Sequence, residues 1–235
     1  LRWAKGPFEM MNKIGIQQSH EMAVEYQNLC LDDAGKPTWQ VAEFFAKQAS
    51  SNIPWDFSYV DTSITDGVAT ITINRPEAMN ALNETVIKQL GQAVEAVNGN
   101  SAVHTMVLDG AGKAFVAGAD VKFFVDKIRS NSIGDIVEFT SNGHEVLNAI
   151  ENSTKTTVAL TTGLALGGGL ELALCCDYRI GTRRTQFRFP ETSIGIYPGL
   201  GGSQRPARIS GIPLARWAVL GGCLLYTSDA ADELC

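Results

Sequence analysis

The chain has 235 residues, 45% of them hydrophobic, which is enough apolar material for a sizeable core and excludes an intrinsically disordered protein. Its 19 lysines and arginines against 25 aspartates and glutamates give a formal net charge of -6, which argues against a dedicated nucleic-acid binder. No apolar run reaches the roughly 18 residues of a membrane span and no secretion signal opens the chain, so we expect a cytoplasmic protein without membrane contacts.

Residues 1–50 have the pattern of a short all-helical segment. Residues 5–8 form a predicted turn, and the apolar spacing of Met10, Met11 and Ile14 predicts a helix after it. A second helix is predicted through about 20–31. Thr38 is the predicted cap of a third helix, which carries apolar residues on one face. Residues 51–56 form the predicted linker to the next domain. We expect this segment to be too small for a robust core of its own.

The main domain is expected to span residues 57–222 and to begin with a β-hairpin. Apolar and polar residues alternate in 59–64 and in 68–74, and Asp66-Gly67 between them is typical of a hairpin turn. Asn83 then caps a predicted helix with an apolar stripe. The further predicted elements are a strand at 106–108, a helix at 136–150, a strand at 157–160, a helix at 170–176 and a strand at 178–182. This alternation favours an α/β fold.

Several common functional motifs are missing. There is no phosphate-binding P-loop and no G-x-S-x-G element of a serine hydrolase. Gly110-Ala111-Gly112 follows a strand, but Phe115 stands where a dinucleotide-binding fingerprint needs glycine. The five cysteines form no C-x-x-C pair, so we expect neither a metal site nor a disulfide framework.

Glycine is unusually concentrated, with 12 of the 23 glycines lying between Gly163 and Gly222. The run Gly167-Gly168-Gly169 joins a strand to an apolar helix. Glycines there allow a backbone N–H to approach a ligand closely, and a developing oxyanion is one such ligand. The alternative is a close helix–strand crossing without a ligand, and the glycines alone leave both interpretations open.

Two glutamates are candidate acid–base groups. Glu171 lies in an otherwise apolar helix, so it either faces solvent or is buried with a raised pKa. Taken alone, the solvent-facing interpretation is favoured. Glu191 follows Pro190 at the start of a turn, where its simplest role is to complement a helix dipole. Two carboxylates on either side of a substrate can also divide the work, one activating water as an anion and the other delivering a proton.

A second loop and a basic stretch complete the candidates. The segment 115–122 follows a strand and contains small residues, so it is a candidate for a second oxyanion donor. The alternative is an ordinary strand-to-helix turn with Asp120 as its cap.

A basic stretch runs from Arg179 to Arg216, with seven arginines and only one acidic residue. Such a stretch could bind ligand phosphates or RNA, although a solvated face is the favoured interpretation.

Taken together, these pieces resemble the crotonase, or enoyl-CoA hydratase, superfamily over about residues 57–220. The matching motifs follow one order: Ile73-Asn74-Arg75-Pro76, Asn80-Ala81-Leu82-Asn83, Ala117 to Lys122, Ala165 to Ala173, Phe189-Pro190-Glu191 and Gly195 to Arg205. The resemblance implies a crotonase-like spiral of ββα units and a coenzyme A thioester as substrate.

The resemblance also assigns roles to residues. The two backbone N–H groups that hold the thioester oxygen map onto Ala119 and Gly168, and the two hydratase glutamates map onto Glu171 and Glu191. Family members with other reactions often lack one of these glutamates, so the presence of both points to hydration. Contacts to the coenzyme A portion map onto four residues of one loop: Ala117, Asp120, Val121 and Lys122.

The expected activity is hydration of trans-2-enoyl-CoA to 3-hydroxyacyl-CoA in fatty-acid β-oxidation or a related acyl-CoA pathway. The alternatives are another crotonase reaction such as enoyl-CoA isomerisation, or a non-catalytic RNA-binding or inactive fragment. The hydratase domain needs no cofactor, because coenzyme A is part of the substrate. A homo-trimer or hexamer is implied by the family, and nucleic acid is not an expected partner.

Both flanks of the domain carry further expectations. Lys5 to Met10 and Ile14-Gly15 resemble the C-terminal helical domain of a 3-hydroxyacyl-CoA dehydrogenase, which precedes the hydratase in bifunctional proteins. NAD would belong only to the dehydrogenase part that this chain lacks. Residues 223–235 are unrelated in pattern to what precedes them and are interpreted as a sequencing or cloning scar after a C-terminally truncated hydratase domain.

Overall fold

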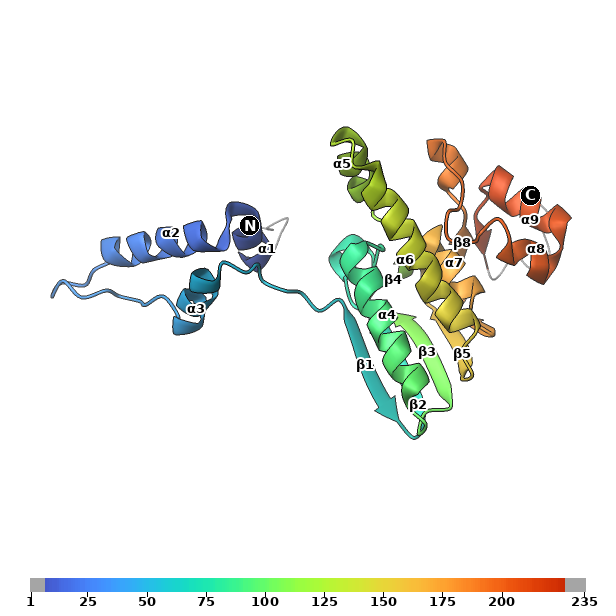
Figure 1. Cartoon of the computed structure of the whole chain (residues 1–235), viewed down its shortest axis with the longest axis horizontal. Coiled ribbons are helices and arrows are strands. Elements are labelled where there is room, and N and C mark those ends of the chain that lie inside the picture. The colour runs from blue at the N-terminus through green and yellow to red at the C-terminus, as the bar shows by residue number, and fades with distance from the viewer. Residues whose placement is uncertain (1–6, 227–235) are drawn as a thin grey trace. The chain divides into compact units, whose positions relative to one another are not determined.

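The computed structural model describes residues 7–226 of the chain. The chain divides into two compact units, with the boundary in the sequence between Phe57 and Ser58 (Figure 1). Within residues 7–226, no helix combines the length and apolarity that a membrane crossing requires. The end of the tail, residues 227–235, lies outside the described residues, so most of the predicted scar does too.

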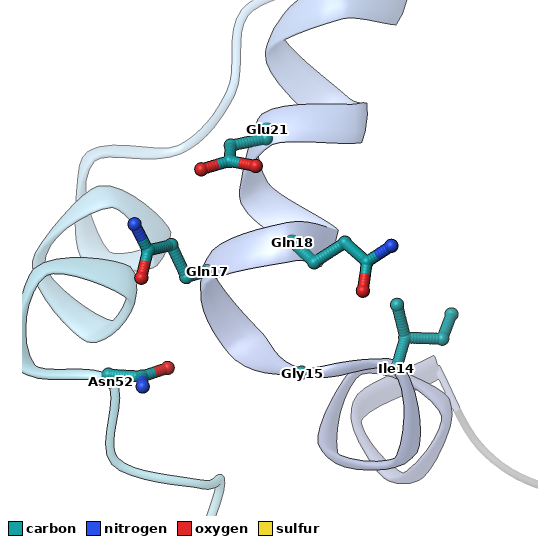
Figure 2. Close-up of a pocket in the computed structure, with 6 residues that line it drawn as sticks. All are labelled: Ile14, Gly15, Gln17, Gln18, Glu21 and Asn52. Atoms are coloured by element: carbon teal, nitrogen blue, oxygen red, sulfur yellow. The ribbon is translucent and has the colours of Figure 1, made fainter.

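The N-terminal unit is helical, as the sequence pattern predicts. It contains α1 (Pro7–Ile14), α2 (Ile16–Leu29) and α3 (Glu43–Ser51). Gly15, with φ of 108°, separates α1 from α2, and a surface pocket lies at this break (Figure 2). The buried core of the unit is small and consists of Ile16, Phe45 and Ala49.

The predicted cap of the third helix is wrong. Ala42 is the N-cap residue of α3, and its side chain makes no capping hydrogen bond. Thr38 instead uses its hydroxyl to donate a 3.1 Å hydrogen bond to the carbonyl of Cys30. Its backbone N–H bonds to the same carbonyl, so Thr38 closes the loop after α2 rather than starting the next helix.

The first sheet of the second unit begins with the predicted hairpin. Strands β1 (Val60–Thr65) and β2 (Val68–Ile73) pair antiparallel. Asp66 and Gly67 turn the chain with φ of 50° and 75°, both in the left-handed region that this type of turn requires. Three parallel strands extend the sheet in the order β1-β2-β3-β5-β7: β3 (Thr105–Gly110), β5 (Thr156–Thr161) and β7 (Tyr178–Gly181).

A second sheet, absent from the predicted elements, is made of very short strands. Its order is β4-β6-β8-β9, with β4 (Ala114–Ala117), β6 (Leu164–Leu166), β8 (Gln186–Arg188) and β9 (Leu225–Tyr226). Each of β3, β5 and β7 is therefore followed by a strand in the other sheet. This alternation between two sheets produces the repeated ββα units expected from the resemblance.

The helices of the second unit differ in length and burial. Asn83 caps α4 (Glu84–Gly99) as predicted, because its side chain accepts a 2.9 Å hydrogen bond from the N–H of Val86. Figure 1 shows α4 beside α6 (Ile133–Glu151), and both contribute buried residues to the main core. The remaining helical elements are η1 (Pro76–Ala78), α5 (Val121–Arg129), α7 (Gly168–Leu174), η2 (Glu191–Ile194), α8 (Arg205–Ser210) and α9 (Ile212–Gly221).

Candidate active site

The three glycines before α7 have separate structural roles. Gly167 has φ of 48° and ψ of -119°, a conformation that L-residues rarely adopt, and its N–H donates to the carbonyl of Arg188. A side chain on Gly169 would collide with the carbonyl oxygen of Val116 in β4, so this glycine permits a close helix–strand crossing. Gly168 lies between them and faces Ala119. The close helix–strand crossing is therefore confirmed at Gly169, and the oxyanion interpretation stays a prediction for Gly168.

The backbone amides of Ala119 and Gly168 lie close together. A Cβ placed on Gly168 would be 3.8 Å from the amide nitrogen of Ala119. Within residues 7–226, neither amide donates a hydrogen bond to a protein acceptor. The side chains of Leu82 and Leu200 border the same position, at 3.2 Å and 3.6 Å from that Cβ. The result is a pair of donors beside an apolar wall, which suits a developing oxyanion.

The loop that presents Ala119 is fixed by backbone hydrogen bonds to Leu82. The N–H of Leu82 donates to Gly118, and the N–H of Asp120 donates back to Leu82, at 2.9 Å and 2.8 Å. Gly118 adopts φ of 83°, which turns the chain out of β4. Because the amides on both sides of Ala119 are held, its own N–H has a fixed direction.

Asn80 anchors the neighbouring segment and was not singled out from the sequence. Its side chain is fully buried and its amide nitrogen donates to the carbonyls of Ala111, Ala114 and Phe115. Its carbonyl oxygen accepts from the N–H of Arg75. The only sequence signal was its place in a motif shared with the crotonases.

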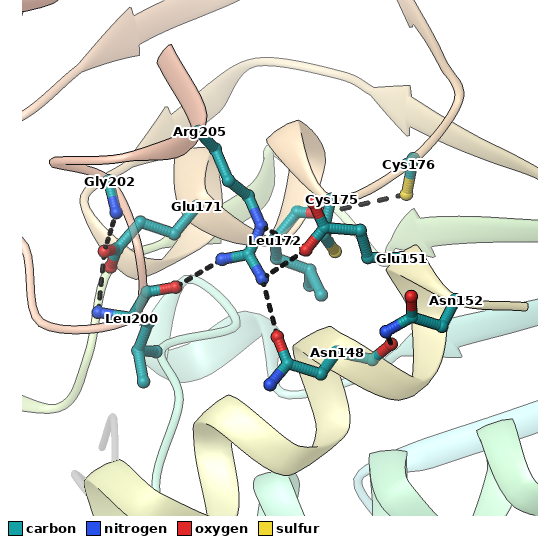
Figure 3. Close-up of polar contacts among 10 residues, drawn as sticks. All are labelled: Asn148, Glu151, Asn152, Glu171, Leu172, Cys175, Cys176, Leu200, Gly202 and Arg205. Atoms are coloured by element: carbon teal, nitrogen blue, oxygen red, sulfur yellow. Dashed lines mark hydrogen bonds and ion pairs between the residues drawn. The ribbon is translucent and has the colours of Figure 1, made fainter. Parts of the chain in front are cut away.

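Glu171 is buried rather than solvent-facing, so the interpretation favoured for the isolated residue is wrong. It lies in the first turn of α7 with 2% of its surface exposed. Its Oε1 atom accepts hydrogen bonds from the N–H groups of Leu200 and Gly202, both at 2.7 Å (Figure 3). Burial raises its pKa to about 7, against the opposing effect of these two hydrogen bonds. The nearby Glu191 carboxylate raises it further, and Arg205 lowers it.

Glu191 lies against the first glycine of the run. It is the first residue of η2 and is 8% exposed. A Cβ on Gly167 would lie 2.6 Å from its Oε1 atom, so the glycine leaves room for this carboxylate. Its Oε2 atom is buried and has no hydrogen-bond partner among the described residues. Burial raises the pKa of Glu191, with its own backbone amide opposing.

The four candidate coenzyme A contacts are in unequal surroundings. The N–H of Ala117 is already donated to the carbonyl of Met79. Asp120 caps α5 through a hydrogen bond from the N–H of Lys122 and pairs with Arg75 at 3.0 Å, as the turn interpretation of this loop predicts. Val121 and Lys122 are exposed. Asp120 is thus engaged within the protein, and the two exposed residues are available to a ligand.

Arg205 is the residue whose importance the sequence analysis missed. The basic stretch from Arg179 to Arg216 suggested a charged surface, but Arg205 is only 5% exposed and binds the protein itself. Arg179 and Arg188 also donate to backbone carbonyls, those of Cys176 and Gly222. At least three of the seven guanidinium groups are therefore already engaged by internal acceptors, which weakens the case for an RNA-binding surface.

The pocket in the N-terminal unit has no comparable chemistry. Its lining consists of Ile14, Gly15, Gln17, Gln18, Glu21 and Asn52 (Figure 2). In the described part of the chain, no group of three or more His, Cys, Asp or Glu side chains is arranged to hold a metal ion. Cys175 and Cys176 are buried free thiols. The candidate active site is therefore the region around Gly167–Gly169 in the second unit.

Comparison with known proteins matches this unit. A protein-family model described as enoyl-CoA hydratase/isomerase matches residues 68–233. Crotonyl-CoA hydratase of Syntrophomonas wolfei is 43% identical over 169 residues, and short-chain-enoyl-CoA hydratase of Clostridium acetobutylicum is 39% identical over 169 residues. Each alignment covers 71% of this chain and 61% of the relative, so the chain spans less than two thirds of their length.

The fold comparison agrees with the sequence comparison. The crystal structure of an enoyl-CoA hydratase from Bacillus anthracis superposes with a TM-score of 0.69 at 30% identity, covering 74% of this chain and 66% of that one. The expected crotonase-like α/β fold is therefore confirmed for the second unit. Since the family model matches more than half of the chain, the chain belongs to the enoyl-CoA hydratase/isomerase family, the crotonase superfamily.

Proposed function

We propose that the second unit hydrates trans-2-enoyl-CoA to 3-hydroxyacyl-CoA. The observation that carries this proposal is that two buried glutamates lie next to the glycine run that contains Gly168. Glu171 is in the first turn of the helix that this run begins, and the Glu191 carboxylate lies against Gly167. Burial raises the pKa of both. Isomerisation of a double bond requires proton transfer alone, whereas hydration also requires a group that activates water. Two acid–base groups in one site meet that requirement.

The paired amides act on the thioester. The substrate double bond is conjugated with the thioester carbonyl, so addition of water at Cβ places negative charge on the carbonyl oxygen. The N–H groups of Ala119 and Gly168 stabilise this enolate, and each such donor contributes about 2.7–4 kcal/mol in comparable oxyanion sites. The apolar contacts of Leu82 and Leu200 beside Gly168 exclude water from the same position and strengthen both hydrogen bonds.

The two glutamates divide the proton transfers. Glu171 accepts the proton of the attacking water, and its pKa of about 7 leaves a substantial ionised fraction near neutral pH. Glu191 delivers a proton to Cα, and its buried Oε2 has no competing hydrogen-bond partner among the described residues. Burial raises the pKa of Glu191 above that of an exposed glutamate. This division follows the family resemblance, and the unequal hydrogen bonding of the two carboxylates supports it.

The direct test is hydration of crotonyl-CoA, followed by loss of the ultraviolet absorption of the conjugated enoyl thioester. The expected result is turnover by the chain and its loss in Glu171→Gln and Glu191→Gln. A matched 3-enoyl-CoA substrate tests isomerisation in the same preparation. Turnover of the 3-enoyl substrate without hydration of crotonyl-CoA would replace the proposed reaction with isomerisation.

The remaining expectations are extensions of this proposal. The acyl-CoA substrate brings its own coenzyme A, so the reaction requires no separate cofactor. Val121 and Lys122, exposed at the start of α5, are the two candidates best placed for the coenzyme A portion. A trimer or hexamer, a cytoplasmic location and descent of residues 1–50 from a dehydrogenase domain remain predictions. The mass of the native source protein and of its assembly tests the fusion and the oligomeric state.

A further inference from the structure

Arg205 ties two distant parts of the second unit together. Its Nε and Nη2 atoms donate to Glu151 Oε2 at 3.0 Å and 2.8 Å, and Nη2 also donates to Asn148 Oδ1 at 3.1 Å (Figure 3). Both partners lie near the end of α6. On the other side, Nη1 donates a 2.6 Å hydrogen bond to the carbonyl of Leu200. The guanidinium therefore links the last turn of α6 to the loop before α8.

That loop is the same one that holds Glu171. Leu200 offers its carbonyl to Arg205, while its own N–H and that of Gly202 donate to the Glu171 carboxylate. Gly201, with φ of 102°, stands between the two donors, and a side chain there would collide with the guanidinium. A Cβ on Gly202 would lie only 3.0 Å from Glu171 Cγ. Glycines at 201 and 202 thus let an arginine and a glutamate bind opposite sides of one short loop.

The charges around Glu171 come from several elements. Glu191 of η2 raises the pKa of Glu171, and Arg205 of α8 lowers it. Glu151 of α6 neutralises part of the Arg205 charge through their ion pair. Cys175, one turn after Glu171, has a pKa raised well above its usual value by burial and remains a neutral thiol. Arg205 is the only positive group in this set.

We propose that Arg205 is a positioning residue for the proposed hydratase reaction, holding the Leu200–Gly202 loop in place so that its amides fix the Glu171 carboxylate. Asn148 and Glu151 in turn fix the guanidinium. The catalytic consequence rests on the proposed function, but the placement of the carboxylate does not. In this arrangement Arg205 also acts on Glu171 at a distance, as a counter-charge.

The test is a direct titration of the Glu171 carboxyl carbon by nuclear magnetic resonance in the full chain with 13C-labelled glutamate, assigned with Glu171→Gln. Arg205→Gln removes the positive charge and should raise the titration midpoint by about 0.5–1 pH unit. Glu151→Gln keeps the guanidinium and removes its neutralising partner, so the midpoint should fall. Arg205→Lys keeps the positive charge but lacks the several fixed N–H donors of the guanidinium, so its titration midpoint should lie between those of wild type and Arg205→Gln.

Two control variants, and the opposite shifts of the titration midpoint expected for Arg205→Gln and Glu151→Gln, distinguish the positioning role from a purely structural one. Arg208→Gln on α8 and Glu145→Gln on α6 make the same charge changes at exposed positions and should leave the midpoint unchanged. Simple loosening of the fold would move the Arg205 and Glu151 variants in the same direction, and that result overturns the proposal. Unmoved midpoints in both variants overturn it equally. Glu151, partly exposed, also gives a variant that tolerates substitution if Arg205→Gln does not fold.

Kinetics then connect the placement to the reaction. In an active chain, Arg205→Gln should lower kcat at least tenfold with little change in KM, and shift the pH profile by the same amount as the titration. If the wild-type chain shows no hydration while the titration shifts are as stated, the proposed function fails and the positioning role stands. If hydration is normal in Arg205→Gln, the positioning role is overturned and the proposed function stands.

Discussion

Glu171 and Glu191 are the same residue type, both buried in the second unit, yet their carboxylates have different surroundings. Glu171 accepts two backbone hydrogen bonds from one loop, and that loop is fastened to α6 through Arg205. Glu191 faces Gly167 and keeps a buried oxygen without a partner among the described residues. The comparison teaches that burial raises both pKa values, whereas the hydrogen bonds decide how firmly each group is held.

The largest expected effect comes from removing each proton-transfer group in turn. Glu171→Gln and Glu191→Gln keep the side-chain size and remove the acid–base function, so each should lower kcat for crotonyl-CoA hydration by about 10²–10⁴-fold. Steady-state kinetics measure the loss, and Glu145→Gln is the matched control. Undiminished turnover in either variant would remove that glutamate from the mechanism.

The second-largest expected effect is on the pH dependence of stability, to which the two carboxylates contribute separately. The pKa of Glu171 is raised from 4.5 to about 7 in the folded protein, so the folded state holds a proton that the unfolded state releases in this range. The contribution of Glu171 to the unfolding free energy should therefore be fully present below pH 4.5 and fall by about 3 kcal/mol as the pH rises through about 7. Burial also raises the pKa of Glu191, so this residue adds a further decrease of the unfolding free energy as the pH rises.

The measurement compares variants, because other groups titrate in the same range. Glu171→Gln should remove the fall of about 3 kcal/mol, and Glu191→Gln should remove a part of the remaining slope. Amide hydrogen exchange in β3 and β5 reports global opening of the second unit and avoids interference from the N-terminal helices. A slope identical in wild type and Glu171→Gln would show that Glu171 is not a protonated buried group.

The smallest effect is expected at the glycine beside Glu191. Gly167→Ala forces an L-residue into φ of 48° and ψ of -119° and brings its Cβ to 2.6 Å from Glu191 Oε1. The backbone strain should reduce stability by about 1–3 kcal/mol, and the displaced carboxylate should lower kcat. Thermal unfolding and kinetics measure the two losses. Gly99→Ala at the end of α4, where no atom is near and φ is not positive, is the control and should lower neither.

Local sequence signals predicted most elements of the first sheet and the helices around it. Asp66-Gly67 and Asn83 act through their own backbone or nearest neighbours, so their patterns were sufficient for the hairpin and for the α4 cap. Thr38 failed as a cap because the helix begins only at Glu43, while the hydroxyl and N–H of Thr38 both bond to the carbonyl of Cys30, eight residues earlier. The strands of the second sheet are too short, at two to four residues, to show a period of their own.

For the site, the sequence by itself determined which residue types were present and in what order. The glycine run, the two glutamates and the loop ending at Lys122 could be named from their motifs, and the family follows from them. Whether Glu171 faced solvent or the core could not be decided, because a single carboxylate in an apolar helix is compatible with both. Only tertiary structure brings Leu200 and Gly202 to that carboxylate from about thirty residues away along the chain.

Arg205 shows most clearly that the sequence does not reveal which distant residues a side chain contacts. Its sequence neighbours placed it in a basic stretch, but its partners Asn148 and Glu151 lie 57 and 54 residues earlier. Charge interactions depend on distance in space and on burial, and neither is encoded in local composition. The sequence therefore determined the chemical groups and the family, and the fold alone decided which charges meet and which carboxylate is anchored.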